Sequence, residues 1–336
     1  MASGCPVACL PPVAAEAFDS GWWAARGDRD GMMSAPCVIW RVTDGKRGHE
    51  RQTQGLVQAL GRLMPVAVRD VPALSEARAL RSLMTGRFPV SGASSPAIIV
   101  GAGHGTHLTM LAAQRAHGGR TVVLMNPGLP RRYFDLCLVP QHDGVAEAPN
   151  VLMTVGALNA MDLSTEQSGK TGLILLGGLS PHYRWRGRVI AAQVRDIVGR
   201  CPDVVWSLTT SARTPRATAE LLHETLAHDI EFVTPDDAPL DWLPSRLRRA
   251  GQVWVTPDSV SMLYEALTVG AAVGLLDLDP VRTGRVARGV EELHRQGMVV
   301  QYTEWRAGRP LHRPPAQLNE AARCAHWIRE RWFPDL

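Results

Sequence analysis

The sequence predicts an α/β protein in which two domains, each a doubly wound parallel sheet, face each other across a cleft. From residue 37 onward, short apolar segments alternate with helical patterns, as is typical of parallel sheets covered by helices. A polar stretch, ALNAMDLSTEQSGKT (157–171), interrupts this alternation, as a linker between domains would. The length of 336 residues exceeds that of most single cores.

The first domain is expected over residues 37–160. Strands are expected where apolar residues cluster between turn signals, and helices where apolar residues recur every three or four positions. The expected strands are 38–42, 65–69, 97–100, 121–125, 136–139 and 151–154, and the expected helices are 50–63, 75–85 and 106–117.

The second domain is expected over residues 171–314, and GLILLGGLS (172–180) opens it with a strand and a glycine turn. Its further strands are expected near 203–208, 230–233, 252–255 and 272–276, and its helices at 187–199, 214–227, 259–269 and 282–296.

The two ends of the chain differ from these domains. Residues 1–36 lack periodicity and the pattern of a secretory signal, so we expect a disordered or weakly ordered extension. Residues 315–336 start at the second proline of a pair and then predict an amphipathic helix that packs back across the linker. Its apolar face is expected to contain Leu318, Ala322, Ala325, Ile328 and Trp332.

Composition excludes several classes of protein. A hydrophobic fraction of 45%, a charged fraction of 20% and a net charge of +4 argue against a disordered chain and against a nucleic-acid-binding protein. No apolar run reaches the roughly 18 residues that cross a bilayer. The six cysteines lack the spacing of a structural zinc site, so no metal is expected. The preference for arginine over lysine favours a cytoplasmic bacterial protein.

Ligands of open parallel sheets bind beyond the carboxyl ends of the strands, so the loops that leave strands are the candidate sites. In the first domain these loops are DGKRGHERQ (44–52) and GAGHGTH (101–107). The second contains Gly101, Gly103, His104 and Gly105, whose backbone can approach a ligand and expose amides. A tight turn without a ligand is the alternative.

Three loops of the second domain carry similar features. Gly177, Gly178 and Ser180 can hold a diphosphate through backbone amides, unless they form only an interdomain turn. SLTTSARTP (207–215) places hydroxyls and Arg213 before a helix, where the hydroxyls can also be caps. In TPDSVSMLYEA (256–266), Asp258 is expected as a helix N-cap. The three loops together favour an anionic ligand.

These loops, in this order, resemble the elongated-mitochondria fission proteins of plants and their bacterial relatives. The resemblance spans residues 38 to about 280 and includes NPGLPRRYFDLCLVPQHD (126–143) and NVLMTVGALN (150–159). The second half is also similar to B-type glycosyltransferases, which have a Gly-Gly-Ser turn and a Glu-Ala pair followed by glycine. Here that motif is Glu265, Ala266 and Gly270, but Ala271 replaces the usual proline.

This resemblance implies a GT-B fold of two Rossmann-like domains, an acceptor domain followed by a nucleotide-sugar domain. It implies that Gly177, Gly178 and Ser180 contact the donor diphosphate and that Glu265 binds the ribose hydroxyls. Arg213, Asp258, Ser259 and Ser261 are then expected near the phosphates or the sugar.

In a GT-B fold, the loop DGKRGHERQ (44–52) of the first domain is expected to face the cleft. His49 is expected as the general base on an acceptor hydroxyl, because its ordinary pKa lies near neutrality. Asp44 or Glu50 is expected to orient it, and Lys46 and Arg47 to attract an anionic acceptor or the leaving diphosphate. The alternative is that His49 only caps or packs the next helix.

The resemblance implies a metal-independent glycosyltransferase that uses no cofactor and takes a nucleotide-sugar as co-substrate. The sequence does not identify the acceptor, for which a cell-envelope molecule is one option. RRYF (131–134) is the expected point of peripheral contact with the inner membrane. The first alternative is a non-catalytic scaffold of the same fold that binds a protein partner. A nucleotide-sugar epimerase is disfavoured because the chain lacks G-x-G-x-x-G and Y-x-x-x-K.

Overall fold

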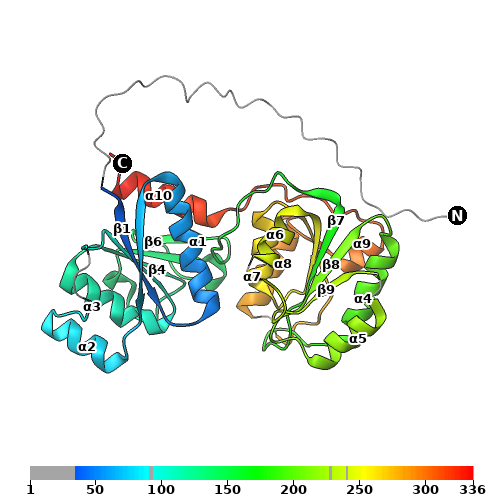
Figure 1. Cartoon of the computed structure of the whole chain (residues 1–336), viewed down its shortest axis with the longest axis horizontal. Helices are drawn as coiled ribbons and strands as arrows, with labels where there is room; N and C mark the ends of the chain where they lie inside the picture. The colour runs from blue at the N-terminus through cyan, green and yellow to red at the C-terminus, as the bar shows by residue number, and fades with distance from the viewer. Residues whose placement is uncertain (1–34, 91–93, 227–228, 240, 283, 336) are drawn as a thin grey trace, which may run out of the picture.

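The computed structural model describes residues 35–335 except 91–93, 227–228, 240 and 283. It has two α/β domains side by side, each built on a six-stranded parallel sheet with helices on both faces (Figure 1). The predicted fold class is therefore confirmed. The expected N-terminal extension, apart from residues 35–36, lies outside the described residues.

The first sheet has the strand order β2-β1-β3-β4-β5-β6. Neighbouring strands are parallel, and Ile39 of β1 pairs with both Val68 of β2 and Ile98 of β3. The strands are β1 (Cys37–Thr43), β2 (Val66–Pro72), β3 (Ile98–Ala102), β4 (Arg120–Leu124), β5 (Leu136–Pro140) and β6 (Val151–Thr154). The helices are α1 (Arg47–Leu63), α2 (Glu76–Thr85) and α3 (His107–His117), with single 3-10 turns η2 (His104–Thr106), η3 (Arg131–Tyr133) and η4 (Gln141–Asp143).

The second sheet has the strand order β12-β11-β10-β7-β8-β9. Its strands are β7 (Ser168–Leu175), β8 (Val205–Thr209), β9 (Glu231–Val233), β10 (Ala250–Val255), β11 (Ala272–Leu275) and β12 (Val300–Gln301). Its helices are α4 (Gly187–Arg200), α5 (Arg216–Leu226), α6 (Trp242–Arg249), α7 (Val260–Thr268), α8 (Arg285–Arg295) and α9 (Tyr302–Arg306).

The central strands of each sheet are buried on both faces, so each domain has two hydrophobic clusters, one under each layer of helices. All residues of β3, β5 and β10 are buried, which explains why β3 and β5 are continuous apolar runs and why β10 has a single polar residue, Gln252. The largest fully buried side chains are Trp40, Trp206, Trp254 and Trp305. Truncation of any of them to alanine is expected to cost about 3–5 kcal/mol.

The final helix, α10 (Glu320–Trp332), packs on α1 of the first domain after the chain has crossed back from the second domain (Figure 1). Ala325 and Ile328 are buried there as expected. The expected face is wrong in part, because Ala321 is buried and Ala322 is half-exposed. Leu318 precedes the helix and packs into the core of the second domain instead.

Four elements differ from the sequence-based expectation. Helix α1 begins at Arg47, not at 50, so most of DGKRGHERQ is helical. Helix α9 was not predicted because it is too short for periodicity, and a reciprocal capping box between Gln301 and Glu304 fixes its start. Helix α6 and strand β12 are also short and were not predicted. Among the described residues, no helix has the length and apolar character needed to cross a membrane.

Candidate functional site

The two predicted loops of the first domain meet at one point of its sheet. The strand order reverses between β1 and β3, and ligands of doubly wound sheets bind at such a reversal. Asp44 follows β1 and Gly103 follows β3. The parallel pairing of these strands therefore brings DGKRGHERQ and GAGHGTH together, although they are far apart in sequence.

His49 and Asp44 form a hydrogen-bonded pair at this point. The distance from His49 Nδ1 to Asp44 Oδ2 is 2.8 Å, and the Lys46 N–H donates to Asp44 Oδ1 at 3.2 Å. The side chain of His49 is 22% exposed and that of Asp44 only 7%. Asp44 rather than Glu50 thus holds the imidazole, while Glu50 lies half-buried in the first turn of α1 and its charge acts on Arg41.

The ionisation of Asp44 follows from its surroundings. Burial raises the pKa of Asp44, but hydrogen bonds from His49 and from the Lys46 N–H outweigh burial and leave its pKa below the ordinary value. In the tautomer of His49 that carries its proton on Nδ1, that N–H donates to the ionised Asp44. Nε2 is then the nitrogen with a free lone pair, as a general base requires.

The glycine loop forms a wall against His49. Gly103 has φ of 82° and ψ of 159°, and a Cβ at this position would lie 2.2 Å from His49 Cε1. Gly105 faces Asp44, and Gly101 packs against Met110 and Thr106. Gly103 therefore allows the close approach of the loop to His49.

Other predicted residues of the first domain lie at the edge of this cluster. His104 is exposed and packs its ring 5.4 Å from that of buried His107, centroid to centroid. Burial lowers the pKa of His107 to about 4. Lys46 is 70% exposed and places Nζ 3.9 Å from Asp44 Oδ2. Arg47 is exposed at the start of α1.

In the second domain, side chains of the protein already occupy the glycine turn. The Gly177 N–H donates to Thr256 Oγ1 at 2.7 Å, and the Gly178 N–H donates to Asp258 Oδ2 at 2.9 Å. Ser180 Oγ accepts from the backbone of His182 and Tyr183. The two glycine amides that were expected to contact a diphosphate are thus satisfied internally.

Arg213 completes this cluster. Its Nη2 lies 3.1 Å from Asp258 Oδ2, and its Nη1 donates to the Leu179 carbonyl at 3.1 Å. The interpretation of Asp258 as an N-cap is wrong, because its carboxylate turns toward Gly178 and Arg213 and the N-cap of α7 is Ser259. Asp258 Oδ1 is buried and has no hydrogen-bond partner within the described part of the chain.

Glu265 lies at the interface between the domains. It is 8% exposed, and its Oε1 lies 3.8 Å from Nη1 of Arg51 on α1. Both residues line a cavity of about 130 Å³, together with Arg47, Gln52 and Ser261. Burial raises the pKa of Glu265, and Arg51 opposes the rise. Ser259 is buried beside this helix start.

The start of the linker lines this cavity through Ala157, Leu158 and Asn159, and the residues around it are held in place. Asn159 Nδ2 donates to Thr268 Oγ1 on α7 at 3.0 Å, and a Cβ at Gly156 would lie 2.0 Å from the ring of Tyr264. The Val155 N–H donates to Glu320 of α10 at 3.0 Å. Both domains and the terminal helix therefore hold the linker.

Several of these residues were not predicted from the sequence. Arg51 lies within the loop that was singled out, and its charge at the end of DGKRGHER was the available signal. Gly156 and Asn159 lie within NVLMTVGALN (150–159), and the part of that segment in the family resemblance was the available signal for them.

The structure therefore gathers the predicted site residues into three groups, and RRYF (131–134) belongs to none of them. The groups centre on His49, on Asp258 and on Glu265. RRYF exposes less aromatic surface for the expected membrane contact than its sequence suggests, because Phe134 is only 3% exposed. Tyr133 is 48% exposed and lies beneath the guanidinium of Arg132. Among the described residues, no group of three or more His, Cys, Asp or Glu side chains is placed to bind a metal ion.

The comparisons with known proteins concern both sequence and fold. No curated protein matches the sequence at a significant level. A structure named as a UDP-N-acetylglucosamine 2-epimerase from Listeria monocytogenes is 14% identical with a TM-score of 0.57, covering 90% of this chain and 98% of that chain. A second UDP-N-acetylglucosamine 2-epimerase is 14% identical with a TM-score of 0.53 and the same coverage of 90% and 98%. MurG of Acinetobacter baumannii is 12% identical with a TM-score of 0.46, covering 88% and 100%.

The structural matches above a TM-score of 0.5 share the two-domain fold described here, which is the GT-B fold. The family described as Mitochondrial fission ELM1 matches residues 47–332, from the first residue of α1 to the last residue of α10. The chain therefore belongs to the Mitochondrial fission ELM1 family.

Proposed function

We propose that the protein is a metal-independent glycosyltransferase that moves a sugar from a nucleotide-sugar to an acceptor hydroxyl. The observation that carries this proposal is the pair of His49 and Asp44, 2.8 Å apart at the reversal point of the first sheet. A largely buried carboxylate that holds a half-exposed imidazole is the arrangement that a general base needs.

The proposed reaction is a single displacement at the anomeric carbon. The acceptor oxygen forms the new glycosidic bond, its proton passes to His49 Nε2, and the bond to the diphosphate breaks with its electron pair leaving on the phosphate oxygen. Arg47, Lys46 and Arg213 offset the charge of the leaving group. Basic side chains and amides can supply this stabilisation without a metal ion.

The donor is assigned to the second domain and the interface. Glu265 accepts hydrogen bonds from ribose hydroxyls, and Ser261, which lines the same cavity, lies near the phosphates. Burial of Glu265 supports this role, since a buried charged group with a raised pKa is more frequent at functional sites than elsewhere.

A non-catalytic scaffold is the second candidate, and the occupied glycine turn favours it. Because Thr256 and Asp258 already accept from Gly177 and Gly178, a diphosphate gains these amides only if it displaces side chains. A scaffold that has lost donor binding would retain such an internally satisfied turn.

An epimerase is not disfavoured by the missing G-x-G-x-x-G motif. Two structures that share the fold are named as UDP-N-acetylglucosamine 2-epimerases, so the motif argument does not separate the two activities on this fold. An epimerase would convert the nucleotide-sugar without an acceptor, whereas a transferase would release nucleoside diphosphate only when an acceptor is present.

The test is a thermal-shift screen against UDP-, GDP-, ADP-, dTDP- and CMP-sugars, with UDP-N-acetylglucosamine first. A ligand that binds the folded state raises Tm. We expect one nucleotide family to raise Tm in the wild type and in Glu224→Gln, an exposed control on α5, and not in Glu265→Gln. No shift with any nucleotide-sugar would reject the transferase and support the scaffold.

A further inference from the structure

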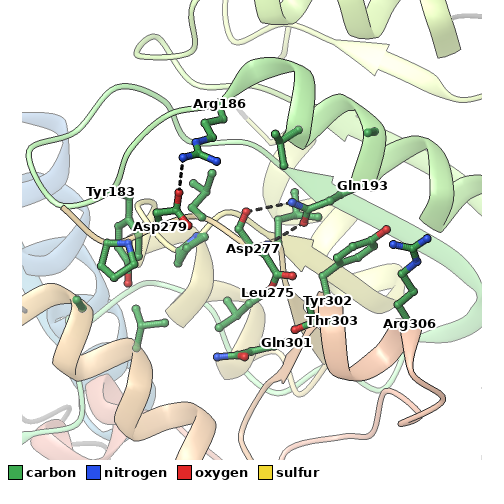
Figure 2. Close-up of a pocket in the computed structure, with 18 of the residues that line it drawn as sticks. Tyr183, Arg186, Gln193, Leu275, Asp277, Asp279, Gln301, Tyr302, Thr303 and Arg306 are labelled. Atoms are coloured by element: carbon green, nitrogen blue, oxygen red, sulfur yellow. Dashed lines mark hydrogen bonds and ion pairs between the residues drawn. The ribbon is translucent and has the colours of Figure 1, made fainter. Parts of the chain in front are cut away.

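The second domain contains a larger pocket that the proposed reaction does not use. Its volume is about 970 Å³, and it lies beyond the carboxyl ends of β11 and β12 between helices α4, α8 and α9 (Figure 2). Leu275 and Leu276 line it where β11 ends, and Tyr302 lines it from the start of α9. This volume is at the upper end of the range for small-molecule sites.

Helix α8 separates this pocket from the domain interface. On one side of the helix, Arg285 Nη1 lies 3.0 Å from Asp143 Oδ1 of the first domain, and Gly289 packs beside His142. On the other side, Ala287 and Glu291 line the pocket. With 3.6 residues per turn, positions 285 and 289 share one face and positions 287 and 291 lie roughly opposite.

A short antiparallel bridge closes the same boundary. The Arg184 N–H donates to the Asp279 carbonyl at 2.8 Å, and the Val281 N–H donates to the His182 carbonyl at 2.9 Å. The pocket is therefore distinct from the cavity beside Glu265.

The walls of the pocket are already ordered by hydrogen bonds. Gln193 Nε2 donates to the Asp277 carbonyl at 3.0 Å, and the Asp277 N–H donates to Gln193 Oε1 at 2.8 Å (Figure 2). The Tyr302 hydroxyl donates to Asp196 at 2.8 Å. A ligand would thus find a preformed site and would not have to order one.

The charges of the pocket exclude a polyphosphate. Its arginines are each paired with a lining carboxylate, Arg186 with Asp279 at 3.0 Å and Arg306 with Asp196 at 3.8 Å. Glu291 adds a further acidic group. A nucleotide would bring more negative charge into a site whose arginines are already paired with carboxylates. The resulting repulsion would weaken its binding.

The remaining chemistry suits hydroxyl groups. Paired carboxylates and guanidinium groups offer acceptors and donors, while the buried Leu275 and Val290 and the exposed Ala192 offer apolar contact. The aromatic residues of the pocket, Tyr183 and Tyr302, are each 7% exposed, so a nucleobase would have little ring surface on which to stack. A compact, uncharged, polyhydroxylated molecule matches these features.

We propose that this pocket is a second ligand site that binds an uncharged saccharide. The site goes beyond the donor site proposed above and does not depend on it. If the protein is a transferase, a saccharide held here would be acceptor or product glycan bound away from the reacting centre, next to the segment that follows the Gly177–Gly178 turn.

The test is ligand-observed NMR with glucose, N-acetylglucosamine, maltose and chitobiose at high millimolar concentration. Ala192 is exposed on α4 and lines the pocket, so Ala192→Trp fills the pocket without disturbing the core. Ala217→Trp on the exposed side of α5 is the matched control. Val189→Trp, at a position that is 43% exposed, is a second blocking variant if the first does not fold.

We expect at least one saccharide to bind the wild type and Ala217→Trp, and to bind the blocking variant about tenfold or more weakly. Nucleotide-induced thermal shifts should stay equal in all three proteins, which separates this site from the donor site. The proposal is overturned if none of the four sugars binds, or if the blocking variant binds them as well as the wild type. It is equally overturned if spermidine or inorganic diphosphate, and no saccharide, occupies the pocket.

Discussion

Arg51 Nη1 lies 3.8 Å from Glu265 Oε1, and this contact joins helix α1 of the first domain to helix α7 of the second. Glu265 is buried, whereas the Arg51 side chain is 56% exposed. The carboxylate therefore bears the desolvation cost of the pair, and the guanidinium compensates only in part. Its raised pKa reflects this imbalance.

The first prediction concerns the stability of the protein as a function of pH. Because the folded-state pKa of Glu265 is raised, folding favours its protonated form. The stabilisation from the neutral form is fully present below the unfolded pKa of about 4.3 and is lost as pH rises through the raised pKa. Glu265→Gln is neutral at every pH, so its Tm should exceed that of the wild type at neutral pH.

The same difference in Tm should shrink as pH falls below the unfolded pKa of glutamate. Glu224→Gln, at an exposed position on α5, should follow the wild type throughout a pH series of thermal melts. A Tm of Glu265→Gln below that of the wild type at neutral pH would show that the ionised form stabilises the fold.

The second prediction concerns Arg51 and rests on the proposed donor role of Glu265. Arg51→Gln removes the charge that opposes the rise in the pKa of Glu265, so a larger share of Glu265 is protonated at a given pH. As pH is lowered, the affinity for the stabilising nucleotide-sugar should therefore begin to fall at a higher pH than in the wild type. Arg51→Lys should restore the profile in part, because it restores the charge without the planar geometry.

Calorimetric titrations at several pH values measure this shift. Arg216→Gln, at a 91% exposed side chain, is the control and should behave as the wild type. An identical pH profile for Arg51→Gln and the wild type would contradict the coupling between the two residues.

The third prediction separates binding from turnover in the first domain. His49→Ala and Asp44→Asn should each lower kcat by about 10²–10⁴-fold, the usual contribution of a general base. Donor binding should stay unchanged, since the pair lies outside the proposed donor residues. Thermal shift with the donor and product release with an acceptor measure the two quantities.

His223→Ala, at an exposed position on α5, is the matched control and should retain full turnover. Full turnover in His49→Ala would remove the base assignment. Loss of donor binding in Asp44→Asn would place the donor in the first domain and reverse the proposed roles of the domains.

The fourth prediction concerns stability alone and is independent of function. Gly103 combines φ of 82° with a Cβ position 2.2 Å from His49, so Gly103→Ala suffers both backbone strain and a clash. Gly144 has φ of 63° and open space around its Cβ position, so Gly144→Ala suffers strain alone. We expect a loss of about 1–2 kcal/mol in Gly144→Ala and a larger loss in Gly103→Ala.

Urea unfolding curves measure both losses. Adding His49→Ala to Gly103→Ala should recover part of the difference, because the smaller side chain removes the clash. Equal losses in the two single variants would mean that His49 moves aside at no cost.

Local sequence patterns were enough to predict the fold class and most of the element positions. Strand β6 was predicted with the bounds that the structure shows, and β5 and α3 within one residue. Burial on both faces makes such strands continuous apolar runs, and helices show a period of 3.6 residues. Both signals are read within a single segment. Short elements such as α9 escaped prediction because they complete too few periods.

The candidate site was predictable only as a set of residues. His49 and Asp44 are five positions apart, so their pairing at a helix start was foreseeable. That Gly103 packs on His49 follows from the pairing of β1 with β3, and a sequence does not display strand order.

The tertiary structure also determines which groups accept hydrogen bonds from the amides of the glycine turn and which charged side chain lies beside Glu265. The acceptors for Gly177 and Gly178 come from residues about 80 positions away, because β7 pairs with β10. The pairing of Glu265 with Arg51 requires two domains and a linker to be in place. The sequence by itself determined which segments are strands or helices and which polar residues stand at their ends. The partners of those residues are set by packing between distant segments, because a buried polar group is satisfied by whichever group the fold brings within hydrogen-bond distance.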